Sequence, residues 1–128
     1  MNEMKTEIST NAAPAAIGPY SQAIAAGGML YVSGMLGIDP ATGVLEDSVT
    51  DQAERAFKNL AAVLRESGTD SSSVVKTTVF LTDLSFFAAV NEIYSEYFTA
   101  PYPARSCVEV KALPKGAKFE IEAIAELQ

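Results

Sequence analysis

The sequence predicts an α+β domain over residues 1–128, in which a single mixed β-sheet carries two helices packed on one face, in the order β-β-α-β-α-β-β. Three observations predict this class. Two segments place apolar residues at helical spacing, short segments rich in β-branched residues surround them, and glycine and proline mark the breaks. Because two helices cover only one face, we expect the other face to be solvated or pressed against another subunit.

The first part of the chain predicts an arm and a hairpin. Residues 1–16 are polar and then alanine-rich, and we expect them to form an extended N-terminal arm. Residues 23–26 predict a short apolar strand, Gly27-Gly28 a hairpin turn, and residues 29–34 the return strand.

Two segments have the periodicity of amphipathic helices. The first covers residues 49–67, where Ser48 with Asp51 resembles an N-terminal cap and Gly68 suits the left-handed residue that ends a helix. The second runs from Asp83 to about Phe98. The apolar stripes are Val49, Ala53, Ala56, Phe57, Leu60, Val63 and Leu64 in the first helix, and Phe86 or Phe87, Val90, Ile93, Tyr94 and Tyr97 in the second.

Three further strands are expected. Residues 74–81 are rich in β-branched side chains and predict a largely buried strand. Residues 103–125 predict two strands, separated by the break Leu113-Pro114-Lys115-Gly116. If these two strands pair as a hairpin, alternation places Arg105 and Cys107 on the same sheet face as Glu120.

That shared face would combine an arginine with a carboxylate. The Arg105 guanidinium offers a planar fork of donors that matches the carboxylate of a small molecule, and Glu120 is suited to position or deprotonate a water. The pattern therefore indicates a pocket for a small anion, with hydrolysis as a candidate reaction. The simpler alternative is an ordinary surface ion pair of Arg105 with Glu109, Glu120 or Glu122.

Polar residues at three other positions flank the predicted elements. Tyr20 follows a Gly-Pro turn signal, and its hydroxyl lies either at a pocket rim or on a half-buried aromatic at the surface. Ser33-Gly34 ends a strand and exposes backbone donors that suit a ligand. Asn91 lies beside an apolar stripe, where a boundary residue bonded to backbone is the simpler interpretation and a ligand contact the alternative.

Composition narrows the function classes. The net charge is −7 and the chain has no histidine, which argues against nucleic-acid binding and removes the commonest general base and metal ligand. Cys107 is the only cysteine, so we expect neither an internal disulfide nor a multi-cysteine metal site, and a reducing, cytoplasmic location. We expect no secretory signal and no membrane span.

Six blocks of the sequence resemble the RidA (YjgF/YER057c/UK114) family, in the right order from Ile17 to Ala125. Such a set is far more specific than one short motif. The blocks are Gly18-Pro19-Tyr20-Ser21-Gln22-Ala23, Tyr31-Val32-Ser33-Gly34, Val75-Lys76-Thr77-Thr78-Val79-Phe80-Leu81, Phe87-Ala88-Ala89-Val90-Asn91, Pro103-Ala104-Arg105-Ser106-Cys107-Val108-Glu109-Val110, and Leu113-Pro114-Lys115-Gly116-Ala117 with Glu120-Ile121-Glu122-Ala123.

The resemblance implies a chorismate-mutase-like fold, assembled as a homotrimer with pockets between neighbouring subunits. It implies hydrolysis of reactive 2-imino acids and their enamine tautomers, such as 2-iminobutanoate and 2-iminopropanoate, to 2-keto acids and ammonia. This activity removes damaging metabolites and needs no cofactor.

The resemblance also implies a role for each site residue. Arg105 clamps the substrate carboxylate, and Glu120 holds the attacking water. By the same resemblance, Cys107 forms part of the pocket wall, largely through its backbone. Read directly, the sequence has no histidine to activate Cys107 as a nucleophile, so a small packing residue is the simpler interpretation. The surrounding substrate-binding residues are Tyr20, from a neighbouring subunit, with Ser33, Gly34 and Asn91.

One departure from the family pattern matters. Met35 stands where glutamine usually follows Ser33-Gly34, whereas Gly37 stands where proline is frequent but glycine also occurs. Met35 removes the amide donors and acceptor beside the pocket, which bears on loop shape and substrate preference.

The alternative function is a non-catalytic module that binds a 2-keto acid. An RNA-directed role is disfavoured by the acidic charge, and no residue supports a chaperone role.

Overall fold

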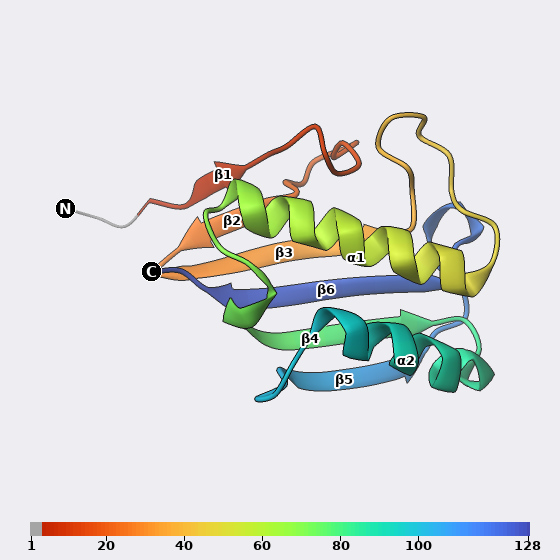
Figure 1. Ribbon diagram of the computed structural model, residues 1–128. Helices are drawn as coiled ribbons and strands as arrows, with labels where there is room; N and C mark the ends of the chain where they lie inside the picture. The colour runs from red at the N-terminus through yellow and green to blue at the C-terminus, as the bar shows by residue number, and fades with distance from the viewer. Residues whose placement is uncertain (1–3) are drawn as a thin grey trace.

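A six-stranded mixed sheet forms the centre of the computed structural model, which describes residues 4–128, and both helices lie on the same face of that sheet (Figure 1). The strand order is β1-β2-β3-β6-β4-β5, and only β4 and β5 pair in parallel. The predicted α+β class is therefore confirmed. The elements are β1 (Thr6–Ile8), β2 (Ala23–Ala26), β3 (Met29–Leu36), α1 (Val49–Glu66), β4 (Val74–Leu81), α2 (Phe87–Tyr97), β5 (Ala104–Glu109) and β6 (Phe119–Glu126).

Strands β2 and β3 form the predicted hairpin across Gly27-Gly28. The two glycines have φ values of 59° and 78°, the left-handed conformation that a tight hairpin turn requires. Strand β1 was not predicted from the sequence: it lies within the expected arm of residues 1–16 and pairs antiparallel with β2. Residues 1–3 of that arm lie outside the described residues.

Helix α1 packs across β3 and β6 on the covered face of the sheet (Figure 1). It begins as predicted, because Ser48 Oγ accepts a hydrogen bond from the Asp51 backbone N at 3.1 Å. Gly68 follows its last turn with a φ of 83°. Phe57 is fully buried at the centre of the core, where its ring stacks on that of Tyr97 with 4.9 Å between centroids.

Helix α2 connects the two parallel strands β4 and β5. A 3₁₀ turn, Leu84–Phe86, precedes it, and the Asp83 carboxylate accepts a hydrogen bond from Ser85 N at 2.8 Å at the start of that turn. Of the predicted apolar stripe, Val90, Ile93 and Tyr94 are buried, and Phe86 and Tyr97 are partly buried against the core, whereas Phe87 is 38% exposed.

The two C-terminal strands do not form a hairpin, because β4 lies between them. Every second residue of β6 from Phe119 to Ala125 is buried, which suits a central strand, whereas most of β5 is exposed, which suits an edge. The chain therefore places β6 between β3 and β4, and β5 reaches the edge of the sheet through α2.

This topology separates the predicted site residues. Arg105 of β5 lies opposite Thr77 of β4, whereas Glu120 of β6 lies opposite Phe80 of the same strand. Residues 77 and 80 point to opposite faces of β4. The prediction that Arg105 and Cys107 share a face with Glu120 is therefore wrong: the first two lie on the helix-covered face, and Glu120 lies on the other.

The face opposite the helices has no covering element within residues 4–128 (Figure 1). It presents apolar side chains that are partly exposed in the single chain: Tyr31 is 47% exposed and Val108 is 42% exposed. Lys76 and Glu122 lie among them. A sheet face of this composition is suited to contact with another subunit.

Candidate active site

A β-bulge in β3 shapes the candidate site. Between Val32 and Met35 the pairing of β3 with β6 shifts, so that three steps along β3 match two steps along β6. Ser33 and Gly34 form the bulge, and Ser33 Oγ donates to the carbonyl oxygen of Ser21 at 2.6 Å. Bulges redirect a strand locally and are frequent beside active sites. Here the bulge holds the segment before β2 against β3.

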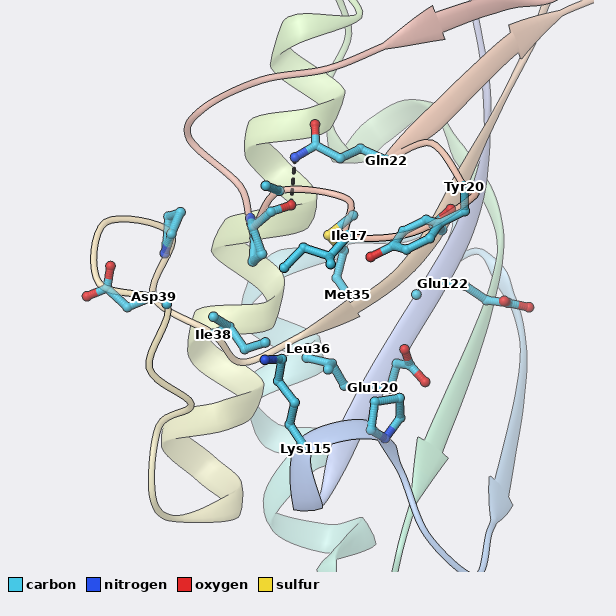
Figure 2. A pocket seen from close by; sticks show the side chains of 17 residues that line it. Ile17, Tyr20, Gln22, Met35, Leu36, Ile38, Asp39, Lys115, Glu120 and Glu122 are labelled. Atoms are coloured by element: carbon cyan, nitrogen blue, oxygen red, sulfur yellow. Dashed lines mark hydrogen bonds between the residues drawn. The ribbon is translucent and has the colours of Figure 1, made fainter.

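A cavity of about 800 Å³ opens beside this bulge, and we call it the Glu120 cavity (Figure 2). The segment before β2, the loop after β3, the turn before β6 and the start of β6 form its walls. Four predicted site residues line it: Tyr20, Ser33, Gly34 and Glu120. Three do not: Asn91, Arg105 and Cys107.

Glu120 projects into this cavity from β6 (Figure 2). Burial, with a smaller contribution from the neighbouring Glu122 carboxylate, raises the pKa of Glu120 above the usual glutamate value. Gly34 leaves room for the Glu120 carboxylate in its present position, because a Cβ atom at residue 34 would force that flexible side chain to shift. A carboxyl group with a raised pKa is suited to exchange protons with a water or a substrate nitrogen.

The segment before β2 forms one wall, and a buried glutamine that we did not single out as a site residue holds it. Gln22 Nε2 donates to the Pro14 carbonyl at 2.7 Å, the bond drawn in Figure 2, and its Oε1 accepts from Thr10 N at 2.7 Å. Tyr20 and Ile17 then point into the cavity (Figure 2), although they are 54% and 78% exposed. The sequence signal that could have indicated this role is the position of Gln22, a glutamine directly before an apolar strand.

Lys115 is a second residue that sequence reasoning did not place in the site. Its backbone has a φ of 60°, a left-handed conformation that costs a non-glycine residue roughly 1–2 kcal/mol. Its side chain reaches across the cavity toward Leu36 and Ile38 (Figure 2). Lys115 forms no ion pair with another described residue. It therefore supplies a point charge, without the planar fork of an arginine.

Arg105 is fixed on the covered side of β5 by residues of α2. Its Nη1 donates to Asn91 Oδ1 at 2.7 Å, and its guanidinium carbon lies 4.7 Å from the centre of the Tyr94 ring and 5.3 Å from that of Phe87. Contacts of this kind stabilise a guanidinium and orient its remaining donors. We call these four residues with Cys107 the Arg105 cluster.

The structure does not support the surface ion pair that was the simpler alternative for Arg105. Within residues 4–128 it forms no ion pair, and Glu109 instead accepts a hydrogen bond from Leu84 N at 2.8 Å. Asn91 is likewise bonded to a side chain and not to backbone. The geometry therefore leaves the Arg105 guanidinium available to an external anion.

Cys107 lies partly buried beside Arg105 and packs against the hydrophobic core. Burial raises the pKa of its thiol, and the positive charge of Arg105 opposes this rise. A thiol with a raised pKa is protonated at neutral pH and is a poor nucleophile. The side chain therefore acts as a small packing residue at this position.

Met35 is the residue that departs from the family resemblance, which would place glutamine at this position. It is only 4% exposed, belongs to the hydrophobic core and also lines the Glu120 cavity. Figure 2 shows its sulfur atom beside Ile17. The wall that Met35 shares with Ile17 and Ile38 is therefore apolar, which favours a ligand with an aliphatic portion.

Within residues 4–128, no three His, Cys, Asp or Glu side chains gather in a way that would hold a metal ion. Neither helix of this part of the chain combines the length and apolar character that crossing a membrane requires.

Comparison with known proteins gives concordant results. The family model described as Endoribonuclease L-PSP matches residues 10–127. The RutC family protein y4sK of Sinorhizobium fredii is 60% identical over 94% of this chain and 96% of its own length. The human 2-iminobutanoate/2-iminopropanoate deaminase is 50% identical over 92% of this chain and 87% of its own. A crystal structure of the Rid family protein YyfA from Yersinia pestis has a TM-score of 0.94 at 50% identity, and covers 97% of this chain and 100% of that one.

The sequence blocks, the sheet topology and these relatives all indicate the same family over nearly the whole chain. The family model alone spans residues 10–127, and the relatives extend over the same range of the sheet and both helices. The chain therefore belongs to the RidA (YjgF/YER057c/UK114) family, which the matching family model describes as Endoribonuclease L-PSP.

Proposed function

We propose that the protein hydrolyses reactive 2-imino acids and their enamine tautomers, 2-iminobutanoate and 2-iminopropanoate among them, to 2-keto acids and ammonia. The observation that carries the proposal is the division of the site into two complementary parts on opposite faces of one sheet: an anion-binding Arg105 cluster and a Glu120 cavity. The human relative named 2-iminobutanoate/2-iminopropanoate deaminase supports the choice of substrate.

The two parts meet in the assembled protein, which we propose is a homotrimer with a pocket between each pair of neighbours. The Arg105 cluster of one chain then faces the Glu120 cavity of the next. Both parts carry exposed apolar side chains suited to such a contact: Phe87 is 38% exposed beside Arg105, Leu84 is 48% exposed in the turn before α2, and Ile17 and Tyr20 are exposed at the cavity. The uncovered sheet face adds further contact area.

The Arg105 cluster holds the substrate carboxylate. Asn91 and the ring of Tyr94 fix the guanidinium, so that little side-chain entropy is lost when an anion binds. The remaining N–H groups offer two parallel donors to one carboxylate. Lys115 lies in the cavity as a lone ammonium, which lacks this bidentate geometry. Arg105 is therefore the better clamp.

Glu120 acts on the water. A water oxygen adds to the C=N carbon, and one of its protons passes through the Glu120 carboxylate to the imine nitrogen, which gives a carbinolamine. Transfer of the hydroxyl proton to nitrogen then breaks the C–N bond, releases ammonia and leaves the keto oxygen that came from water. The imine carbon is already electrophilic, so positioning of the water and the substrate provides much of the acceleration.

The test measures release of 2-ketobutyrate or pyruvate from an imine generated in situ, against its spontaneous hydrolysis. We expect Arg105→Ala to lose about 10- to 100-fold in kcat/KM, as expected for a charge-assisted hydrogen-bonded pair. Arg65→Ala is the matched control, because Arg65 is an exposed arginine in the last turn of α1, away from both parts of the site. Equal activity of the two variants would remove Arg105 from the mechanism.

Binding of a 2-keto acid without turnover is the second candidate, because Met35 gives the cavity an apolar wall where the family usually has an amide. A well-folded wild type that does not accelerate imine hydrolysis but binds 2-ketobutyrate by calorimetry would favour this function. In that case Glu120→Gln would leave the affinity nearly unchanged, and Arg105→Ala would weaken it.

A further inference from the structure

The first turn of α1 places a fully buried amide between two walls of the Glu120 cavity. Gln52 is 1% exposed and does not itself line the cavity. On one side of it lies the loop between β3 and α1, which contributes Ile38 and Asp39 to the cavity. On the other side lies the turn before β6, which contributes Lys115.

The Gln52 side chain bonds to both walls at once. Its Nε2 donates to the carbonyl oxygens of Glu46 at 2.9 Å and Asp47 at 3.2 Å, at the end of the loop. Its Oε1 accepts from the backbone N of Lys118 at 2.8 Å, at the end of the turn. Both hydrogens and the oxygen of the amide are therefore used, and the amide holds the two walls at one separation.

A second observation shows how closely the loop approaches α1. A Cβ atom at residue 37 would collide with the Cα and carbonyl oxygen of Gln52, so only glycine fits there without movement. Glu46 N also donates to the Gly37 carbonyl at 2.9 Å, which closes the loop on itself beneath Gln52. The loop thus rests on the Gln52 backbone and is bonded to its side chain.

We propose that Gln52 is a positioning residue for the reaction: it fixes the loop of residues 37–47 relative to the turn of residues 114–118, and thereby the place of Glu120 in the cavity. Lys118, its bonding partner, is two residues before Glu120, and the Lys118 carbonyl is held from the other side by Thr82 N at 3.2 Å. The catalytic part of this inference rests on the proposed function; the coupling of the two walls does not.

The test compares Gln52→Met, which keeps the length of the side chain but removes its hydrogen bonds, with Val63→Ala, which removes core volume from the same helix. Val63 is fully buried in the core and does not line the cavity, so this control lowers the melting temperature without touching either wall. Hydrogen exchange is followed by mass spectrometry in both variants and the wild type, and imine hydrolysis is measured in parallel.

We expect Gln52→Met to raise the hydrogen-exchange rate in both segments, residues 37–47 and residues 114–120. We expect Val63→Ala to leave unchanged the difference in exchange rate between these segments and the rest of the chain. We expect kcat to fall about tenfold in Gln52→Met with KM nearly constant, because the substrate carboxylate is held elsewhere. Faster exchange in only one of the two segments overturns the proposed coupling, and so does equal behaviour of the two variants. If the wild type shows no hydrolysis, the proposed function fails, and hydrogen exchange alone decides the coupling.

Discussion

The Arg105 cluster and the Glu120 cavity are built in opposite ways. Arg105 lies at the edge of the sheet, already oriented by Asn91 and the ring of Tyr94, but does not line the Glu120 cavity of its own chain. Glu120 lies in a large cavity whose walls include the exposed side chains of Ile17 and Tyr20. In the proposed mechanism, one part supplies a rigid anchor and the other supplies space and a proton acceptor. The difference implies that, on this proposal, each part is incomplete by itself.

Subunit mixing gives the largest expected effect. Arg105→Ala and Glu120→Gln should each have little activity alone. After denaturation and refolding of an equal mixture, about a quarter of the pockets in random trimers pair an intact arginine with an intact glutamate from the next chain. We therefore expect activity to return to about a quarter of the wild-type level. Mixtures that stay as inactive as the single variants would place the whole site within one chain.

The two cations offer the next comparison. Arg105→Lys keeps the charge and loses the planar fork, so we expect kcat/KM to fall about tenfold. Lys115→Met removes the charge inside the Glu120 cavity, and we expect a loss of less than about threefold, because an exposed lysine contributes little to binding. Steady-state kinetics on one imine substrate distinguish them. The reverse order would assign the carboxylate clamp to Lys115.

The raised pKa of Glu120 predicts opposite effects on activity and stability. Burial disfavours the ionised carboxylate in the folded chain, so wild-type stability falls as pH rises through that raised pKa. Glu120→Gln should therefore melt at a higher temperature than the wild type at neutral pH, while it loses activity. The difference in melting temperature should vanish at acidic pH, where the wild-type carboxyl is protonated in both states. A lower melting temperature of the variant at neutral pH would contradict the assigned burial effect.

Glu122 provides a test of the smaller contribution to that pKa. Glu122→Gln removes the neighbouring negative charge, so the pKa of Glu120 should fall and the acid limb of the pH profile should move to lower pH. The measurement is kcat/KM against pH for the two proteins. An unchanged acid limb would mean that Glu120 does not control the rate there.

The smallest effect is expected at Ser48, which belongs neither to the Arg105 cluster nor to the Glu120 cavity. Ser48→Ala removes the cap of α1 and should cost about 1 kcal/mol of unfolding free energy in urea titration. Activity under native conditions should stay at the wild-type level. A loss of activity larger than the loss of folded protein would connect the start of α1 to the cavity through Gln52.

The sequence predicted most of the fold because local signals specified most elements. The cap at Ser48, the left-handed Gly68 and the Gly27-Gly28 turn all formed as expected. Strand β1 was missed because three residues carry too short a pattern, and pairing with β2 defines it. The order of the last strands was also missed, because alternation fixes which residues share a face within a strand and does not fix its neighbour.

The sequence could name candidate site residues, but it could not predict how they are arranged. The family pattern pointed to Arg105 and Glu120, yet their placement on opposite faces depends on β6 inserting beside β4. Gln52 was missed because a polar residue in the first turn of a helix is ordinarily exposed, and its burial depends on contacts with distant segments. Such contacts bridge residues far apart in sequence, which local periodicity cannot reveal.

The Tyr94 ring beneath Arg105 also provides an intrinsic fluorescence probe. The chain has five tyrosines and no tryptophan, so tyrosine fluorescence is not quenched by energy transfer to tryptophan. Tyr94 lies 4.7 Å under the guanidinium, and its hydroxyl shares a 2.8 Å hydrogen bond with Thr77 Oγ1 in the core. An anion that binds to Arg105 changes the electric field at this phenol. A label-free fluorescence titration would therefore measure anion binding separately from turnover.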